Sequence, residues 1–214
     1  MLFGIDLTSA KTKPSACVYL NKKLEVIYYG FSYSDSDIIA EINSLSPRVI
    51  AIDSPLSLAS GLCCLNQDCA CQASSPPKGR NCERQLAKLG IPCYFTTKKS
   101  IIKKMVERGI RIKQQLGQQG YEVIEVYPYA SKVRLFGKPI PKKTTSEGLA
   151  WLREKLSSLF INIHLDKWNH DLCDAAIAAY TGYLYVCGNA EAVGNEEDGL
   201  IYIPKNNYDL KEND

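Results

Sequence analysis

Three strand-like runs at the start of the chain, joined by short connections, constrain the fold more than any other feature. Residues 2–8, 15–20 and 24–32 are rich in Val, Ile, Leu and Tyr, which is typical of half-buried strands. Residues 21–23, Asn-Lys-Lys, separate the last two runs and suit a hairpin turn. Connections this short make neighbouring strands antiparallel. The start of the chain therefore predicts a three-stranded antiparallel sheet.

Helical and strand-like patterns alternate along the rest of the chain. The continuous apolar run 49–53 ends before a Ser-Pro pair and predicts a buried central strand. Two further strands are expected at 121–127 and 200–203. Because helices join these later strands, we expect them to run parallel to the first strand. Apolar residues at helical spacing predict helices over about 36–45, 81–90, 99–118, 145–159 and 168–187.

This element order predicts a single α/β domain over residues 1–214. Its mixed sheet has three antiparallel strands and then parallel strands, with helices on both faces. The composition, 45% hydrophobic and 23% charged, is ordinary for a soluble protein. No apolar run approaches the roughly 18 residues of a membrane span, and no secretory signal pattern is apparent, so we expect a cytoplasmic protein. No heptad pattern identifies an interface, so the oligomeric state stays open, a dimer included.

Four aspartates occupy positions that this fold would bring together. Asp6 and Asp53 end strand-like runs, and Asp171 and Asp174 lie three residues apart at the start of the last long helix. The carboxyl ends of parallel strands meet in one crevice, and residues i and i+3 share a helix face. Carboxylates suit Mg²⁺ or Mn²⁺, and two such ions about 4 Å apart promote phosphodiester hydrolysis. We predict all four as catalytic metal ligands, with at least one raised pKa.

Each acid also has a purely structural explanation. Asp6 could bond backbone amides in the turn that follows it, and Asp53 could be an ordinary turn residue before Ser-Pro. Asp171 and Asp174 could stabilise the helix N-terminus. Glu125, inside an apolar strand, has three alternatives: a fifth catalytic acid, a partner for a buried arginine, or a solvent-facing residue.

Several short motifs along the chain together resemble one uncharacterised family. In order they are Gly4-Ile5-Asp6-Leu7, Asp53-Ser54-Pro55-Leu56, Arg80-x-Cys82-Glu83-Arg84-x-Leu86, Glu125-Val126-Tyr127-Pro128 and Asp171-x-x-Asp174-Ala175. This series, over about residues 2–187, resembles a family of predicted nucleases with an RNase H-like fold. The Asp-x-x-Asp pair is similar to that of RuvC-type resolvases. The resemblance implies catalytic acids on the first strand, the fourth strand and a late helix.

The segment 57–82 is rich in Cys, Ser, Gly and Pro and predicts an ordered insertion or loop. Nine cysteines without a secretory signal indicate reduced thiols or a metal site. We favour structural zinc, then reduced or disulfide-linked cysteines, then an iron–sulfur cluster. The expected zinc ligands are Cys63, Cys64, Cys69, Cys71 and Cys82.

Residues 78–118 carry eleven Lys or Arg against two acids. A basic segment beside an acidic site could contact nucleic-acid phosphates, and we expect this role for Arg80, Arg84, Lys98 and Lys99. The alternative is a solvated helix face. The chain end, 205–214, is expected to be a flexible acidic tail.

These observations favour a metal-dependent nuclease as the function. One alternative is a phosphotransferase or ATPase related to actin and sugar kinases, because residues 4–9 resemble their first phosphate loop. Those proteins duplicate the fold, whereas this chain has one copy. The other alternative is a non-catalytic module that binds nucleic acid or protein. The sequence does not distinguish DNA from RNA, or endonuclease from exonuclease action.

Overall fold

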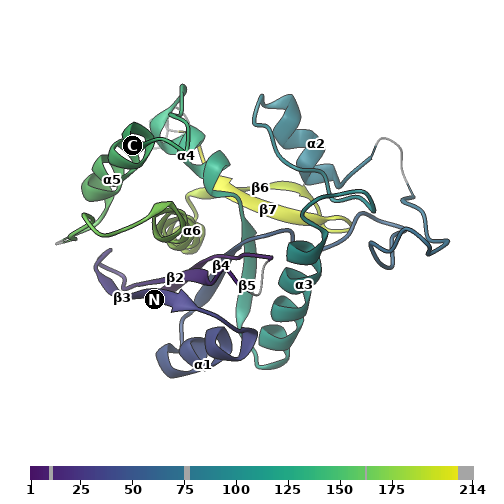
Figure 1. Ribbon diagram of the computed structural model, residues 1–214, viewed down its shortest axis with the longest axis horizontal. Coiled ribbons are helices and arrows are strands. Elements are labelled where there is room, and N and C mark those ends of the chain that lie inside the picture. Colours follow the sequence, from purple (N-terminus) through teal and green to yellow (C-terminus); the bar gives the residue numbers. More distant parts are fainter. Residues whose placement is uncertain (10–11, 75–77, 162, 207–214) are drawn as a thin grey trace.

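A mixed seven-stranded sheet in the order β3-β2-β1-β4-β5-β7-β6 is the centre of the computed structural model, which describes residues 1–9, 12–74, 78–161 and 163–206 (Figure 1). The first three strands pair antiparallel, whereas β4, β5 and β7 extend the sheet in parallel from β1. The last strand pair, β6 and β7, is an antiparallel hairpin. The strands are β1 (Leu2–Asp6), β2 (Ser15–Leu20), β3 (Val26–Ser32), β4 (Val49–Asp53), β5 (Glu122–Val126), β6 (Ala190–Asn195) and β7 (Gly199–Pro204).

Helices cover both faces of this sheet, so the predicted α/β class, with three antiparallel strands followed by parallel strands, is confirmed. Figure 1 shows α6 on one side of the central strands and α1 and α3 on the other. Among the described residues, no helix is both long and apolar enough to cross a membrane. The helices are α1 (Asp35–Leu45), α2 (Asn81–Lys88), α3 (Lys103–Gln118), α4 (Pro128–Phe136), α5 (Ser146–Leu159) and α6 (His170–Val186).

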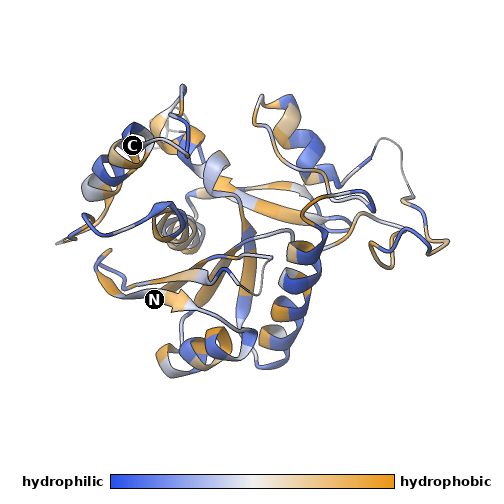
Figure 2. Cartoon of the chain, in the orientation of Figure 1, coloured by the Kyte–Doolittle hydropathy of each residue, from blue (hydrophilic) through white to orange (hydrophobic). Residues whose placement is uncertain are grey.

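Two apolar layers sandwich the central strands. On β4, Val49 and Ala51 pack with α5 and α6, whereas Ile50 and Ile52 pack with α1 and α3. Burial on both faces explains why this strand is a continuous apolar run. Figure 2 shows the central strands as largely hydrophobic, whereas α3 and α5 alternate between hydrophobic and hydrophilic residues. The sheet therefore provides a rigid frame whose strand ends are fixed relative to the helices.

Helix α6 lies unusually close to β1, and Gly4 permits this approach. A β-carbon at Gly4 would lie 2.1 Å from the Ala175 carbonyl oxygen and 2.3 Å from the Ala179 backbone nitrogen. Neither backbone atom can move without shifting the helix. The small residues of α6 and the glycine of β1 thus bring the first turn of α6 beside the end of β1.

Replacing Gly4 by alanine is expected to lower the free energy of unfolding by about 1–3 kcal/mol or more, because the new methyl group overpacks the helix–sheet contact. Gly117 provides the matched control, since a β-carbon there meets nothing within 4 Å and α3 gains helix propensity. Gly117→Ala is therefore expected to be neutral or stabilising in urea-induced unfolding. Equal stability of both variants would contradict the close packing of α6 on β1.

Two elements were not predicted from the sequence. The chain continues after Pro128 as α4, because proline is accommodated at the first position of a helix. Residues 190–195 form β6, a half-buried edge strand, where we predicted no element. Of the expected acidic tail, 205–214, residues 207–214 lie outside the described part of the chain.

Candidate acidic site at the strand ends

Asp6 and Asp53 lie side by side at the carboxyl ends of β1 and β4. The two strands are parallel, and the two aspartates are register partners. Both side chains are partly buried. The strand order thus places two carboxylates, 47 positions apart in sequence, on adjacent strands of one sheet edge.

Helix α6 directs its first turn toward the same edge. Its N-cap is Asn169, whose side chain accepts a hydrogen bond from the Leu172 backbone N–H at 3.0 Å. Asp171 lies in the first turn, and Asp174 follows one turn later and is buried. Because α6 packs directly on β1, the carboxylates of both helix residues approach those of the strand ends.

Two lysines that the sequence analysis did not select lie among these acids. Lys132 of α4 is buried, and its Nζ contacts Asp174 Oδ1 at 2.8 Å. The Lys143 Nζ lies 2.5 Å from Asp174 Oδ2, 3.9 Å from Asp171 Oδ1 and 4.0 Å from Asp6 Oδ2. One ammonium group therefore stands within 4.0 Å of three of the four carboxylates.

The charges of this cluster are unevenly compensated. Burial, together with the charge of Asp174, raises the pKa of Asp6 to about 7. Burial and the charges of Asp6 and Asp174 raise the pKa of Asp53 well above its usual range. Burial opposes ionisation of Asp174 too, but Lys132 and Lys143 hold its pKa below the ordinary value. The strand-end carboxylates are thus short of positive charge, whereas Asp174 is neutralised.

This donor set fits a hard divalent cation. Carboxylate oxygens are the ligands that Mg²⁺ and Mn²⁺ prefer, and a cation would relieve the repulsion that raises the pKa of Asp6 and of Asp53. Among the described residues, only a cysteine loop gathers three or more potential ligand atoms within 4.8 Å of one another. No three carboxylates of the acidic edge have oxygen atoms that all lie this close, and the Lys143 ammonium contacts Asp6, Asp171 and Asp174. Lys143 belongs to a loop, and its side chain is 49% exposed.

The raised pKa of Asp6 predicts how the stability of the fold changes with pH. The folded state binds the carboxyl proton of Asp6 more tightly than the unfolded chain does. The protonated carboxyl therefore adds to the free energy of unfolding below about pH 4, and this contribution is lost as the pH rises to about 7. The variant Asp6→Asn cannot lose that proton. Its melting temperature relative to wild type is expected to increase over this pH range in metal-free buffer. A pH-independent difference would contradict the raised pKa.

Glu125 lines the same groove as Asp53, and its carboxylate is bound by a buried arginine. Its two carboxylate oxygens accept hydrogen bonds from Arg80 at 2.6 and 2.7 Å, and the Leu56 backbone N–H donates to one of them at 2.7 Å. Glu125 is buried, and the Arg80 side chain is 1% exposed. The alternative of a buried arginine partner is the one that the structure shows.

Arg80, which we expected to contact a substrate phosphate, is instead enclosed by two carboxylates, and its side chain is 1% exposed. Its Nε also donates to Glu83 at 2.9 Å, and Glu83 accepts from the Thr96 backbone N–H at 2.8 Å. The buried Arg80–Glu83–Glu125 network joins β5, α2 and the segments around residues 56 and 96. It connects these elements beside Asp53, and its three members line the same groove as Asp53.

The other three residues that we expected to contact phosphates, Arg84, Lys98 and Lys99, differ in their partners and exposure. Arg84 donates to the Gly79 carbonyl oxygen at 2.6 Å and lies 3.8 Å from Asp198. The Lys98 Nζ donates to the Cys69 carbonyl oxygen. Lys99 is exposed. Of the four residues, Lys99 is the one whose placement leaves its ammonium open to a ligand.

The five predicted zinc ligands separate into a cluster of four and one core residue. Cys63, Cys64, Cys69 and Cys71 gather in one loop. Cys82 is instead fully buried with Leu86 in the apolar cluster under β6 and β7. The expectation that Cys82 binds metal with the others is therefore wrong, because its side chain packs against the hairpin.

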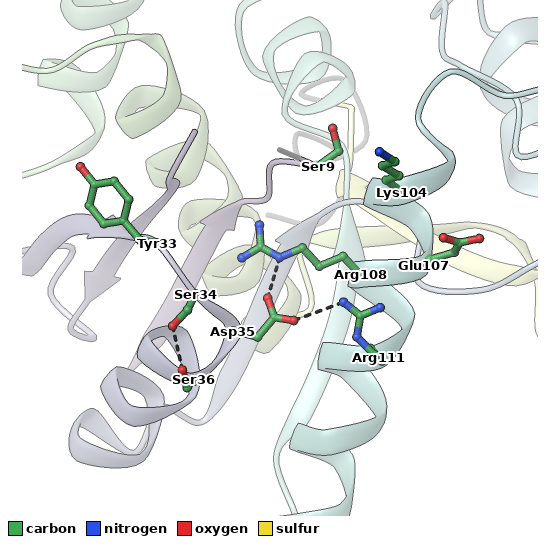
Figure 3. A pocket seen from close by; sticks show the side chains of 9 residues that line it. All are labelled: Ser9, Tyr33, Ser34, Asp35, Ser36, Lys104, Glu107, Arg108 and Arg111. Carbon is green, nitrogen blue, oxygen red and sulfur yellow. Dashed lines mark hydrogen bonds and ion pairs between the residues drawn. The ribbon is translucent and has the colours of Figure 1, made fainter. Parts of the chain in front are cut away.

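A hollow of about 540 Å³, lined mainly by charged and hydroxyl-bearing residues, opens beside the loop that follows β1 (Figure 3). Arg108 forms part of its wall and donates to the Thr8 carbonyl oxygen at 2.7 Å and to Asp35 Oδ1 at 2.6 Å. Figure 3 shows Lys104 and Arg111 of α3 on the same side of the hollow. Arg108 thereby ties the loop after Asp6 to α1 and α3, a role that no motif in the sequence signalled.

Part of the chain matches a family model, and a solved structure is similar over most of its length. Residues 96–198 match the model of a family described as "Protein of unknown function (DUF429)", and no curated protein matches the chain. A solved structure, that of Thermus thermophilus RuvC, is similar over 87% of this chain and 95% of its own length. Its sequence identity is 13% and the TM-score is 0.43. The range matched by the family model includes Glu125, Lys132, Lys143 and both α6 aspartates. The chain thus combines a sheet of three antiparallel strands followed by parallel strands with a segment, residues 96–198, that matches the DUF429 family of unknown function.

Proposed function

We propose that the protein is a divalent-metal-dependent nuclease that hydrolyses phosphodiester bonds at the acidic edge. The observation that carries this proposal is the convergence of carboxylates from β1, β4 and α6, with burial and mutual repulsion raising the pKa of Asp6 and of Asp53. A cluster of this kind is costly to fold unless a cation is bound there. Asp6, Asp53, Asp171 and Asp174 are the proposed ligands of Mg²⁺ or Mn²⁺.

The four ligands differ in what they do before substrate binds. Asp6 and Asp53 are the primary ligands, because they have the least positive charge beside them. Asp171 contacts Lys13 at 2.9 Å on the exposed side of the site and can exchange that partner for an ion. Asp174 stays oriented by the buried Lys132 through Oδ1, which leaves its second oxygen for the ion when Lys143 moves. When bound, two such ions activate water and stabilise the leaving oxygen.

Lys143 is proposed to exchange its carboxylate partners for a substrate phosphate. Its ammonium already sits where a cation is favoured, and the charges of Asp174 and Asp6 raise its pKa although burial opposes this. An ammonium near a phosphoryl group stabilises the negative charge that develops during hydrolysis. The lysine would therefore be displaced by the ion and turn toward the phosphate, remaining part of the site.

Nucleic acid is the proposed substrate because aromatic and basic side chains flank the acids. A groove of about 70 Å³ beside Asp53 is lined by Tyr94 and Tyr127, and Tyr94 is exposed. Exposed tyrosines beside a backbone-cleaving site can stack on bases. Lys99 near this groove in sequence, and Lys104 at the hollow of Figure 3, supply positive charge for phosphates. These contacts favour recognition of backbone and shape over recognition of sequence.

Cleavage of branched, duplex and single-stranded DNA and RNA is the direct test. We expect cleavage of at least one substrate with Mn²⁺ or Mg²⁺, none with a chelator, and none by Asp6→Asn with either ion. Calorimetry with Mn²⁺ alone measures whether the wild type binds metal and Asp6→Asn does not. Metal binding without cleavage would favour a non-catalytic binding module, and metal-dependent hydrolysis of ATP alone would favour the phosphotransferase alternative.

A further inference from the structure

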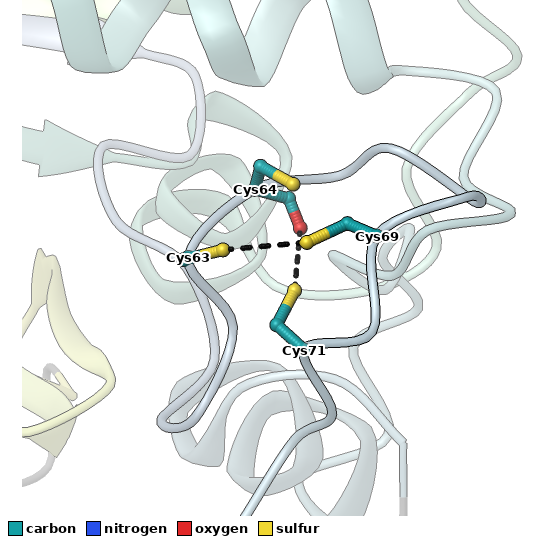
Figure 4. Close-up of side chains that lie close together, drawn as sticks. All are labelled: Cys63, Cys64, Cys69 and Cys71. Carbon is teal, nitrogen blue, oxygen red and sulfur yellow. Dashed lines mark hydrogen bonds between the residues drawn. The ribbon is translucent and has the colours of Figure 1, made fainter.

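Four cysteines of the segment between β4 and α2 form a compact group of sulfur atoms (Figure 4). The Sγ atoms of Cys63, Cys64, Cys69 and Cys71 all lie within 4.8 Å of one another. Figure 4 shows Cys63 and Cys64 on one arm of the loop and Cys69 and Cys71 on the other. All four are free thiols, and Cys63 is exposed while the others are half-buried. The acidic edge does not use any of them.

The spacing of these sulfurs matches ligands of a single ion. A tetrahedral zinc site with Zn–S bonds of about 2.3 Å places its sulfurs about 3.8 Å apart. The Sγ atoms of Cys63 and Cys69 are 3.6 Å apart. A disulfide would need about 2.05 Å. A four-iron cluster binds each thiolate to a different iron and therefore holds the sulfurs further apart than one ion does.

We propose that Cys63, Cys64, Cys69 and Cys71 bind one Zn²⁺ as a tetrathiolate site that stabilises the loop between Ser60 and Asn81. Thiolates select zinc over the hard cations proposed for the acidic edge, so the two sites would not compete for one metal. The site is therefore independent of the nuclease proposal and of its outcome.

Hydrogen bonds within this group shift the pKa values of two of its thiols in opposite directions. Backbone hydrogen bonds to Cys63 and Cys64 lower the pKa of Cys71 to about 6. Hydrogen bonds to Cys71, Cys69 and Cys64 raise the pKa of Cys63 to about 12. Zinc replaces the thiol protons when it binds, so uptake of the ion would release them to solvent.

The loop has few other means of stabilisation within its described residues. A single carboxylate, Asp198, anchors both ends, accepting hydrogen bonds from the Ser60 backbone N–H at 2.7 Å and the Asn81 backbone N–H at 2.8 Å. Between these anchors, Leu65 is the buried hydrophobic residue of the described part. Short segments without a core of their own commonly depend on a metal ion.

The loop also contacts the segment that carries Tyr94. Lys98 donates through Nζ to the Cys69 carbonyl oxygen, and its own carbonyl oxygen accepts from Gln67 Nε2 at 3.5 Å. A bound ion would hold Cys69 and, through Lys98, the approach to the groove beside Asp53. Removal of the ion should therefore loosen residues 93–100 as well as the loop.

Metal analysis of the full chain, purified without chelators, tests this proposal. We expect one zinc per chain in the wild type and at least a tenfold lower zinc content in Cys69→Ser and Cys71→Ser. Cys187→Ser is the matched control, because Cys187 is exposed at the end of α6 and should leave the zinc content unchanged. Cobalt-substituted wild type is expected to show the absorption bands of a tetrathiolate site.

A second measurement on the wild type covers the case in which the serine variants do not fold. The four thiols are expected to react with a thiol reagent slowly in the native protein and at least tenfold faster after zinc is chelated. Hydrogen exchange in the loop and in residues 93–100 should accelerate at the same time. Iron in place of zinc, a disulfide within the group, or zinc content unaffected by Cys69→Ser and Cys71→Ser would each overturn the assignment.

Discussion

Replacing Arg80 by leucine is expected to lower the free energy of unfolding by about 3–5 kcal/mol, which is the usual cost of removing one partner from a buried charge network. Glu83 and Glu125 are both buried and both accept hydrogen bonds from Arg80. Without the arginine, two carboxylates would face each other in an apolar surrounding. Chemical unfolding monitored by circular dichroism measures the loss.

Arg111→Leu is the control for this change, because Arg111 is 65% exposed and its contact with Asp35 is 3.4 Å long. An exposed pair of this kind contributes about 0–1 kcal/mol. Arg80→Lys is expected to restore only part of the lost stability, because an ammonium cannot form the paired contacts to Glu125 and still reach Glu83. If Arg80→Leu unfolded at the same denaturant concentration as Arg111→Leu, the network would not stabilise the fold.

Replacing Asp53 by asparagine is expected to reduce metal-dependent cleavage more than about 100-fold, because even the loss of a group that only orients a metal ligand costs 10–100-fold. The change keeps the size of the side chain and removes the charge that an ion requires. The raised pKa of Asp53 shows that this charge is unfavourable in the metal-free fold. Asp53→Asn should therefore retain or gain thermal stability while it loses activity and Mn²⁺ binding.

Asp166→Asn applies the same chemical change to an exposed aspartate in the turn before α6 and should leave cleavage unchanged. The combination of higher stability and lost activity distinguishes a functional charge from a structural one. A variant of Asp53 that cleaves at the wild-type rate would remove β4 from the proposed site. One that is inactive only because it is unfolded would show the loss in circular dichroism as well.

The strand order could be predicted because its signals are local. Short turns force β1, β2 and β3 to pair antiparallel, and the uninterrupted apolar run of β4 identifies a strand buried on both faces. Helix α4 escaped prediction because Pro128 resembles a strand terminator and also suits a helix start. The strand β6 escaped because its residues are mixed, and it is stabilised by pairing with β7.

Some residues of the candidate site could be predicted from local sequence, whereas the roles of others depend on contacts between distant parts of the chain. Asp6, Asp53, Asp171 and Asp174 could be selected because they mark element ends. Nothing local distinguishes Lys132 or Lys143 from other lysines, since their role depends on α4 and the following loop folding back toward α6. The same limit applies to Arg80, which in sequence belongs to a basic segment and in the fold is enclosed by two glutamates.

Because the cysteine loop is attached at both ends to Asp198, its length can vary without a change elsewhere in the fold. Because Ser60 and Asn81 meet at one carboxylate, the path between them begins and ends at nearly the same point of the β6–β7 turn. Residues can be inserted or removed along that path without moving β4, α2 or the strand ends that carry the acids. A chain without the four cysteines could therefore bridge the same two positions with a shorter turn and keep the sheet unchanged.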